Sequence, residues 1–267
     1  MSGRRLAIAA AVVLVLGVVA AVWYFGAHPT VKNPPAAQAQ QPAAVPPPAQ
    51  PAILHPMPDA GARAGLPPLP ALNDSDAAIT SALGEILGAD AVKIYLVPEN
   101  VIRRIVATVD NLPRQKTPVS KRPVTAVPGA FQAEGDEEHA VLDSRNFARY
   151  RPMVAVIRPL DMERVATLYA HFYPLFQSAY QDLGYPNGYF NDRLIEVIDL
   201  LLATPQVSPP IELARPNVMY VYADAALEAR PAGQKLLIRM GPDNAVAVKA
   251  KLLELRAALT ALPLQKK

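Results

Sequence analysis

The longest stretch of regularly spaced apolar side chains is residues 161–183, with the sequence DMERVATLYAHFYPLFQSAYQDL. Apolar positions recur there at steps of three and four, which is the spacing of one face of an α-helix. They are Val165, Leu168, Tyr169, Phe172, Phe176, Ala179, Tyr180 and Leu183. The spacing is the same on both sides of Pro174, so the sequence predicts one kinked helix rather than two separate helices.

Segments with the same spacing on both sides of this helix predict a largely helical domain. Gly88 is expected to end the first helix, and Pro98 to begin the second in its first turn. Residues 145–157 are expected to form two short helices, because a proline such as Pro152 is favoured at a helix start. The other helices are predicted at 77–87, 98–112, 190–203, 234–240 and 242–262.

Two short segments carry the features of β-structure. Residues 130–142, AFQAEGDEEHAVL, predict a hairpin with its turn at Gly135 and Asp136. Residues 218–222 are rich in β-forming side chains and predict a short strand or an extended pair. The predicted fold class is therefore mainly α, a helical bundle domain with a small β-hairpin or short strands.

Residues Leu6 to Phe25, LAIAAAVVLVLGVVAAVWYF, contain no charged residue and no proline. A helix of this length spans the bilayer's hydrocarbon core of about 30 Å. Trp23 and Tyr24 suit the headgroup region, and Arg4 and Arg5 precede the segment, so the positive-inside rule predicts a cytoplasmic N-terminus. We expect an uncleaved anchor in contact with lipid; the alternatives are a cleaved signal peptide and a domain on the cytoplasmic side.

The order of these segments predicts four parts. Residues 1–5 are the cytoplasmic N-terminus, 6–27 the transmembrane helix, 28–72 a disordered linker rich in Pro, Ala and Gln, and 73–263 the globular domain. Repeated prolines favour polyproline II, so the linker is expected to act as a semi-rigid spacer between membrane and domain. A docking site for a proline-binding module is the alternative.

The composition argues against several functions. The chain has 267 residues, no cysteine and four scattered histidines, which excludes thiolate chemistry and argues against a histidine-rich zinc site. Its formal net charge of +3 does not indicate a broad nucleic-acid-binding surface. The signatures GxxxxGK[ST], HExxH and GxSxG are absent. We therefore predict no cofactor, no metal and no nucleic-acid partner.

Several polar and aromatic residues are embedded in otherwise apolar helices. Side chains so placed either form buried hydrogen-bond networks or line a binding cleft, and the sequence leaves both open. The candidate ligand or partner cleft consists of Arg103, Arg104, Asp110, Asn111, Asn146, Arg149, Tyr150, Tyr180 and Arg239.

Acidic residues support two further hypotheses. Asp110, Asp143 or Asp161, acting with Arg149, would supply the carboxylate chemistry of an enzyme for cell-wall or lipid substrates. Three acidic side chains at helical spacing within residues 192–199 form either a solvated stripe or a site for a hard cation or a basic partner.

Four blocks of the sequence, taken in order, resemble an uncharacterised bacterial family, domain of unknown function 3014. They are LVPENVIRRIVATVDNL, NFARY, LYAHFYPLFQSAYQDLGYP and QKLLIRMGPDN. The resemblance covers residues 69–262 and excludes the linker. It implies a bacterial envelope protein with a single anchor, and it carries over no activity, cofactor or catalytic residue.

The anchor, the spacer and the absent catalytic signatures together predict a binding or scaffolding protein of the bacterial cell envelope. We expect a single-pass protein of the inner membrane with its globular domain in the periplasm. The expected partner is another envelope protein or the cell wall. The alternative is the envelope enzyme described above.

Overall fold

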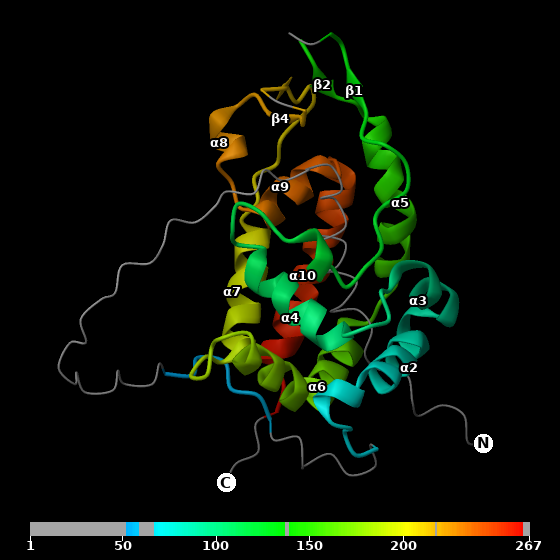
Figure 1. The fold of residues 1–267 in the computed structure, drawn as a ribbon, viewed down its shortest axis with the longest axis vertical. Coiled ribbons are helices and arrows are strands. Elements are labelled where there is room, and N and C mark those ends of the chain that lie inside the picture. Colours follow the sequence, from blue (N-terminus) through cyan, green and yellow to red (C-terminus); the bar gives the residue numbers. More distant parts are fainter. Residues whose placement is uncertain (1–51, 59–66, 137–138, 217, 264–267) are drawn as a thin grey trace, which may run out of the picture.

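The computed structural model describes residues 52–58, 67–136, 139–216 and 218–263. The predicted transmembrane helix and most of the predicted linker lie outside these residues. Among the helices described, none combines the length and the apolar composition that a membrane crossing requires. The described residues form a mainly helical domain with two small antiparallel hairpins, as the sequence predicts (Figure 1).

Helix α6 (Met162–Asp182) is the longest helix described, and it packs against three other helices of the bundle. Buried side chains cover most of its circumference. The Asp161 carboxylate caps its first turn by accepting the N–H groups of Glu163 at 3.0 Å and Arg164 at 3.3 Å. Pro174 lies inside the helix, so the prediction of one helix that continues through this proline is confirmed.

Three helices pack against α6: α4 (Val101–Asn111), α7 (Phe190–Leu202) and α10 (Pro242–Thr260). Each buries a row of aliphatic side chains in one continuous core. In α10 the row is Val248, Leu252, Leu255 and Leu259. Because a fully buried leucine contributes about 2 kcal/mol, these rows hold the bundle together.

Helices α2 (Asp76–Leu87) and α3 (Ala89–Tyr95) form a pair at one side of the bundle (Figure 1). Gly88 separates them with a φ of 86°, a conformation that glycine adopts without a Cβ clash. The predicted end of the first helix at Gly88 is confirmed. The sequence analysis misses α3, because seven residues are too few to display a helical period.

Helix α4 begins at Val101, later than the start predicted at Pro98. The carboxylate of Asp76, in α2, accepts the backbone N–H groups of Asn100 at 2.6 Å and Val101 at 2.8 Å. A side chain from another helix therefore performs the role of the N-cap. The spacing of apolar residues within a helix does not indicate a capping side chain that comes from a distant part of the sequence.

Helix α5 (Arg145–Ile157) is continuous, with Pro152 inside it. The prediction of two short helices in this stretch is therefore wrong. Proline removes one backbone hydrogen bond from the helix interior. Burial of side chains on both sides of Pro152, Tyr150 before it and Met153 and Ile157 after it, offsets that loss.

Strands β1 (Ala133–Glu134) and β2 (Val141–Leu142) form the predicted hairpin. Strands β3 (Leu213–Ala214) and β4 (Val221–Tyr222) form the second hairpin. Strand β4 lies in residues 218–222, for which the sequence predicts a short strand or an extended pair, and β3 lies before them. The N–H of Leu142 donates to Ile211 O at 2.9 Å, and the N–H of Leu213 donates to Ala140 O at 2.8 Å. These bonds join the two hairpins.

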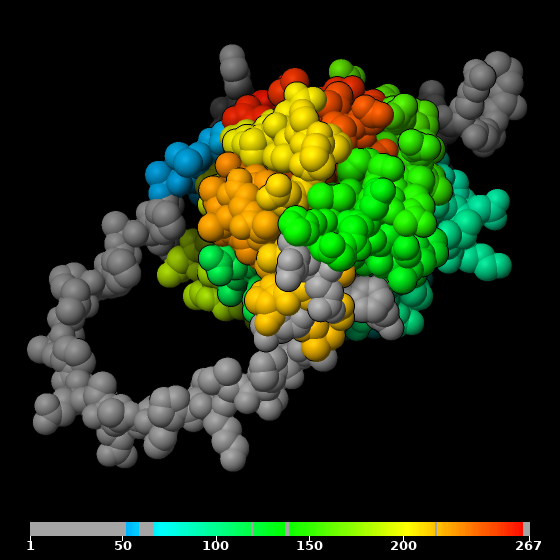
Figure 2. Space-filling view, turned by 90° about the horizontal axis from the view of Figure 1, so that it is seen from above, coloured from blue at the N-terminus to red at the C-terminus, as the bar shows by residue number. Residues whose placement is uncertain are grey.

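The joined hairpins cover one end of the bundle and have a small apolar cluster of their own. Helices α8 (Ala225–Glu228) and α9 (Ala232–Arg239) follow them in the chain. Figure 2 shows this end, with the green residues around β1, β2 and α5 beside the yellow and orange residues that lead from α7 to α9. The cluster contains Ala140, Leu142, Ile211, Leu213, Tyr222 and Ile238.

Residues 52–58, here called the tether segment, run beside the N-terminal end of α7 (Figure 1). The Met57 side chain is 9% exposed and belongs to the main apolar core. The sequence analysis places this segment in the linker, yet it is packed on the domain. The reason is a set of backbone hydrogen bonds to α7 side chains, which composition does not reveal.

Gly241, between α9 and α10, offers a test of the packing. Its φ is 86°, and a Cβ there would overlap the ring of Phe147. We expect Gly241→Ala to lower the free energy of unfolding by about 3 kcal/mol, since backbone strain of about 1 kcal/mol adds to overpacking. Urea unfolding followed by circular dichroism measures the change.

Gly184→Ala is the matched control. Gly184 also has a positive φ, 115°, but a Cβ there meets nothing within 4 Å. Strain alone should then cost about 1 kcal/mol. Equal losses in the two variants would contradict the close packing of Phe147 on Gly241.

Candidate functional site

The nine residues predicted to form a cleft lie at separate places in the structure. Most of them bond to neighbouring segments and fix the course of the chain. Neither of the two pockets described below is lined by any of them. By location they group as Arg103, Arg104 and Asn111 on α4; Asp110 with Tyr180; Asn146 with Arg149; and Tyr150 with Arg239.

The carboxylate of Asp110 is buried and contacts side chains from three parts of the chain. Its Oδ2 accepts from Arg114 at 2.7 Å and from the Tyr185 hydroxyl at 3.3 Å. Its Oδ1 lies 3.3 Å from the guanidinium of Arg193. Tyr180 stacks on Tyr185 with 4.6 Å between ring centroids. The network neutralises the buried charge and ties the end of α4 to α7 and to the turn after α6.

Arg103, Arg104 and Asn111 each bond to a different part of the fold. Arg103 pairs with Asp182 at the end of α6, with 2.8 Å between the charged atoms. Arg104 donates to the backbone carbonyl of Ser120 at 2.5 Å and so holds the loop after α4. Asn111 donates to a carbonyl one turn earlier in its own helix, at 2.6 Å. Their contacts are those of structural residues.

Asn146 and Arg149 hold the segment that leads into β1. Asn146 is 1% exposed; its Oδ1 accepts the N–H of Gln132 at 3.0 Å, and its Nδ2 donates to the carbonyls of Gln132 and Asp143 at 2.6 and 2.8 Å. Arg149 donates to Asn146 Oδ1 at 3.1 Å and to the backbone carbonyls of residues 127–129. The structure therefore brings this predicted pair together, and the two side chains hold the loop before β1 in place.

Tyr150 and Arg239 lie close to Tyr222 of β4. The guanidinium carbon of Arg239 is 5.4 Å from the centre of the Tyr222 ring. Burial raises the pKa of Tyr150 to about 12, although the charges of Arg149 and Arg239 act in the opposite direction. Tyr150 and Tyr222 are each 2% exposed. This cluster is therefore packed against the hairpins and is not open to solvent.

The carboxylates of the enzyme hypothesis are also bonded to separate parts of the fold. Asp143 accepts from the Arg145 side chain at 2.6 Å and from its N–H at 2.7 Å, and these bonds hold the pKa of Asp143 below its usual value. Asp161 caps α6, and Asp110 lies in the network above. A general acid needs a raised pKa, which is the opposite of the shift at Asp143.

The acidic stripe of α7 is divided among three partners. Asp192 accepts hydrogen bonds from the tether segment, Glu196 pairs with Arg193 at 2.9 Å, and Asp199 pairs with Arg256 at 2.5 Å. Over the part of the chain that the structure describes, no group of three or more acidic or histidine side chains has the arrangement of a metal site. The stripe therefore serves contacts within the domain.

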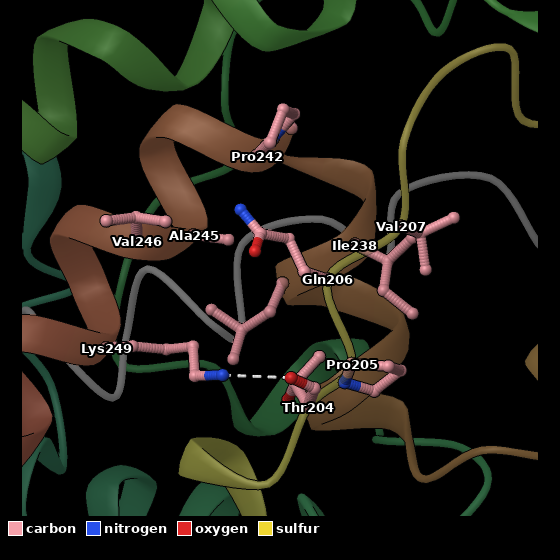
Figure 3. A pocket seen from close by; sticks show the side chains of 11 residues that line it. Thr204, Pro205, Gln206, Val207, Ile238, Pro242, Ala245, Val246 and Lys249 are labelled. Carbon is pink, nitrogen blue, oxygen red and sulfur yellow. Dashed lines mark hydrogen bonds between the residues drawn. The ribbon is translucent and has the colours of Figure 1, made fainter.

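A pocket of about 250 Å³ opens between residues 204–207 and the junction of α9 and α10 (Figure 3). Lys249 lies at its side and donates from Nζ to the carbonyl of Thr204 at 2.9 Å. An apolar pocket with one ammonium group can hold a small apolar group that carries a polar or anionic end. Its other lining residues are Pro205, Gln206, Val207, Leu237, Ile238, Gly241, Pro242, Ala245 and Val246.

The sequence analysis does not predict this pocket. The signal that would have indicated it is an apolar residue on the outward face of the last helix. Val246 is 54% exposed and Leu253 is 59% exposed, although the opposite face of α10 is already buried. A helix with apolar residues on both faces indicates a second contact surface.

A second, more open hollow lies between α2 and α3. Thr80, Gly84, Val92 and Leu96 are among the residues that line it. The Thr80 hydroxyl is buried and has no hydrogen-bond partner among the described residues. This hollow is wide and is lined by one acidic and one basic side chain, Glu85 and Lys93, so its chemistry is less defined than that of the α9–α10 pocket.

A family model described as "Protein of unknown function (DUF3014)" matches residues 101–256. The chain belongs to this DUF3014 family. The match begins at the first residue of α4 and ends within α10, so the DUF3014 region contains most of the bundle core, both hairpins and the whole lining of the α9–α10 pocket. No curated protein and no solved structure matches the chain.

The match confirms the resemblance of the four sequence blocks to this family, and it says nothing about a membrane anchor. The DUF3014 region includes all nine predicted cleft residues and the N-terminal end of α7. Helices α2 and α3 and the tether segment lie before it. The activity of the DUF3014 family is unknown, so function has to be argued from the geometry.

Asn146 and Asn111 give a test of the loop-holding role. We expect Asn146→Ala to lower the free energy of unfolding by about 2–3 kcal/mol, because partners of a buried amide lose their hydrogen bonds. Asn111→Ala, which removes one bond at a half-buried site, should cost less than about 1 kcal/mol. Thermal unfolding of both variants measures the difference. Similar small losses would contradict the structural role of Asn146.

Proposed function

We propose that the chain is a binding or scaffolding protein of the bacterial cell envelope. Residues Leu6 to Phe25 anchor it in the inner membrane, the proline-rich stretch after them acts as a spacer, and the helical domain lies in the periplasm. The support for this location is the uncharged segment itself, with Arg4 and Arg5 before it and two aromatic residues at its end.

The observation that carries the binding role is the way polar side chains are used in the domain. The polar side chains of the predicted cleft, buried at Asp110 and Asn146 and half-buried at its arginines, hold loops and helix ends. Of the two pockets described, the apolar one between residues 204–207 and the α9–α10 junction, with Lys249 at its side, is the better defined and is open to a partner. Such a pocket suits recognition of an apolar group, contributed by another envelope protein or by the cell wall.

The enzyme alternative has less support. Acid–base catalysis needs two groups that converge on one substrate. Asp110, Asp143 and Asp161 are bonded to different partners in different parts of the fold. The α9–α10 pocket is lined by one ionisable side chain, Lys249, and by no carboxylate.

The location is tested with the full-length chain in bacterial cells. We expect it to stay in the membrane fraction after alkaline extraction, and protease added to spheroplasts to digest the domain. Leu14→Arg combined with Leu16→Arg should release the protein, because a charge at a helix centre costs about 2.5–3.5 kcal/mol to insert. Leu14→Ile with Leu16→Val is the control. Wild-type protein in the soluble fraction, or a domain protected from protease, would refute the proposal.

The binding role is tested by photo-cross-linking in the same cells. A photoreactive amino acid in place of Gln206, at the rim of the pocket, should give discrete adducts that are absent when it replaces the exposed Glu163 of α6. Ala245→Trp should remove these adducts by filling the pocket. Ala250→Trp, on the exposed side of the same helix, should leave them unchanged. Adducts that survive Ala245→Trp would show that the pocket is not the binding site.

A further inference from the structure

Asp192, in the first turn of α7, accepts two consecutive backbone N–H groups of the tether segment. Its Oδ2 accepts from Leu54 at 3.0 Å and its Oδ1 accepts from His55 at 2.7 Å. Hydrogen bonds to an ionised carboxylate are stronger than those between neutral groups. One side chain therefore fixes both the position and the direction of this stretch of backbone.

Two side chains next to Asp192 complete the contact. Asn191 Nδ2 donates to the carbonyl of His55 at 2.8 Å, and the Tyr189 hydroxyl accepts the N–H of Met57 at 2.7 Å. The residue between His55 and Met57 is a proline, which has no N–H to offer. Every bond is therefore made to a backbone group that a proline-containing peptide can supply. We refer to Tyr189, Asn191 and Asp192 together as the α7 clamp.

The α7 clamp makes few demands on side chains. Ile53 is 52% exposed and Leu54 is 72% exposed, so these two apolar side chains point largely to solvent. Met57, which is 9% exposed and belongs to the main apolar core, and Pro58 are the buried apolar residues of the segment. Recognition therefore requires a backbone that bends at the two residues bonded to Asp192, a third residue from which no N–H is needed, such as proline, and an apolar residue after it.

The tether segment does not use all the polar groups around the clamp. The Oδ1 atom of Asn191 is buried without a hydrogen-bond partner among the described residues, although the residue is 1% exposed. The same holds for the hydroxyl of Tyr169, a fully buried side chain whose surroundings include Tyr189 and Asp192. A buried polar group without a hydrogen-bond partner destabilises the bound state in which it occurs. The site can therefore bind a ligand that makes one or two more hydrogen bonds better than it binds the tether segment.

We infer that the α7 clamp is a binding site for a proline-containing peptide segment of a partner protein with the same bend as residues 54–55, and that the tether segment occupies it in cis. The partner segment presents two successive N–H groups, a carbonyl, a proline and an apolar residue in the order of residues 54–57. It displaces the tether segment by competition at the same side chains. This inference concerns a surface other than the α9–α10 pocket, and it does not depend on where the domain lies in the cell.

The experiment uses the full-length chain in lipid nanodiscs and a fluorescent peptide with the sequence of residues 52–58, AILHPMP. Leu54→Pro combined with His55→Pro removes both N–H groups that Asp192 accepts and so empties the clamp. Fluorescence anisotropy should show at least tenfold tighter peptide binding to this opened variant than to the wild type. Adding Asp192→Asn to the opened variant should weaken binding at least tenfold.

Asp199→Asn in the opened variant is the matched control, because Asp199 lies on the same helix but pairs with Arg256. It should leave peptide affinity unchanged within twofold. An opened variant that binds the peptide no better than the wild type would overturn the inference. So would an Asp192→Asn substitution that has no effect on binding.

A second measurement needs no substitution and so does not depend on variants that fold. Amide hydrogen exchange at Leu54 and His55 in the wild-type chain should be slow, and saturating peptide should accelerate it at least tenfold. Exchange that is fast without peptide would contradict occupancy in cis. Exchange that stays slow at saturating peptide would contradict competition.

Discussion

The burial of α6 is the constraint on which the rest of the structure depends. A helix with apolar side chains around most of its circumference is stable in water only when other elements cover it. Helices α4, α7 and α10 provide that cover, and their order in the chain then dictates where the connecting segments run. The α2–α3 pair and the joined hairpins are placed at the side and the end of the bundle that these four helices leave open.

Polar side chains in this domain mainly fix the connections between helices. Arg104 and Arg149 donate to backbone carbonyls of the loop between α4 and β1, which has few backbone bonds of its own. Arginine suits this role because its guanidinium presents several donors in a fixed plane. The bonds fix a long connection in which the structure has one short 3-10 helix, Val119–Lys121, and they leave surfaces elsewhere for partners.

The sequence was sufficient for the parts of the fold that repeat locally. The spacing around Pro174 predicts α6, Gly88 marks the end of α2, and the turn at Gly135 predicts the first hairpin. The predictions are wrong where residues distant in the sequence determine the start or the continuity of a helix. Asp76 determines the start of α4, and burial on both sides of Pro152 keeps α5 continuous.

The candidate site was less predictable for the same reason. The sequence marks the polar residues embedded in apolar helices, but it could not say whether Asn146 and Arg149 face a ligand or a loop, because their partners come from residues 127–132. The α9–α10 pocket and the α7 clamp are made of common residue types. The pocket and the clamp arise because segments that are distant in the sequence lie side by side in the folded chain.

The tether segment also determines how the domain carries mechanical load. Any pull transmitted along the chain from before residue 52 reaches the bonds of Leu54 and His55 to Asp192 before it reaches α2. Those bonds join the pulled strand to the first turn of α7, whose far side is packed in the bundle core. Tension is thus delivered first to the centre of the molecule, and the short helices α2 and α3 are shielded from it while the contact lasts.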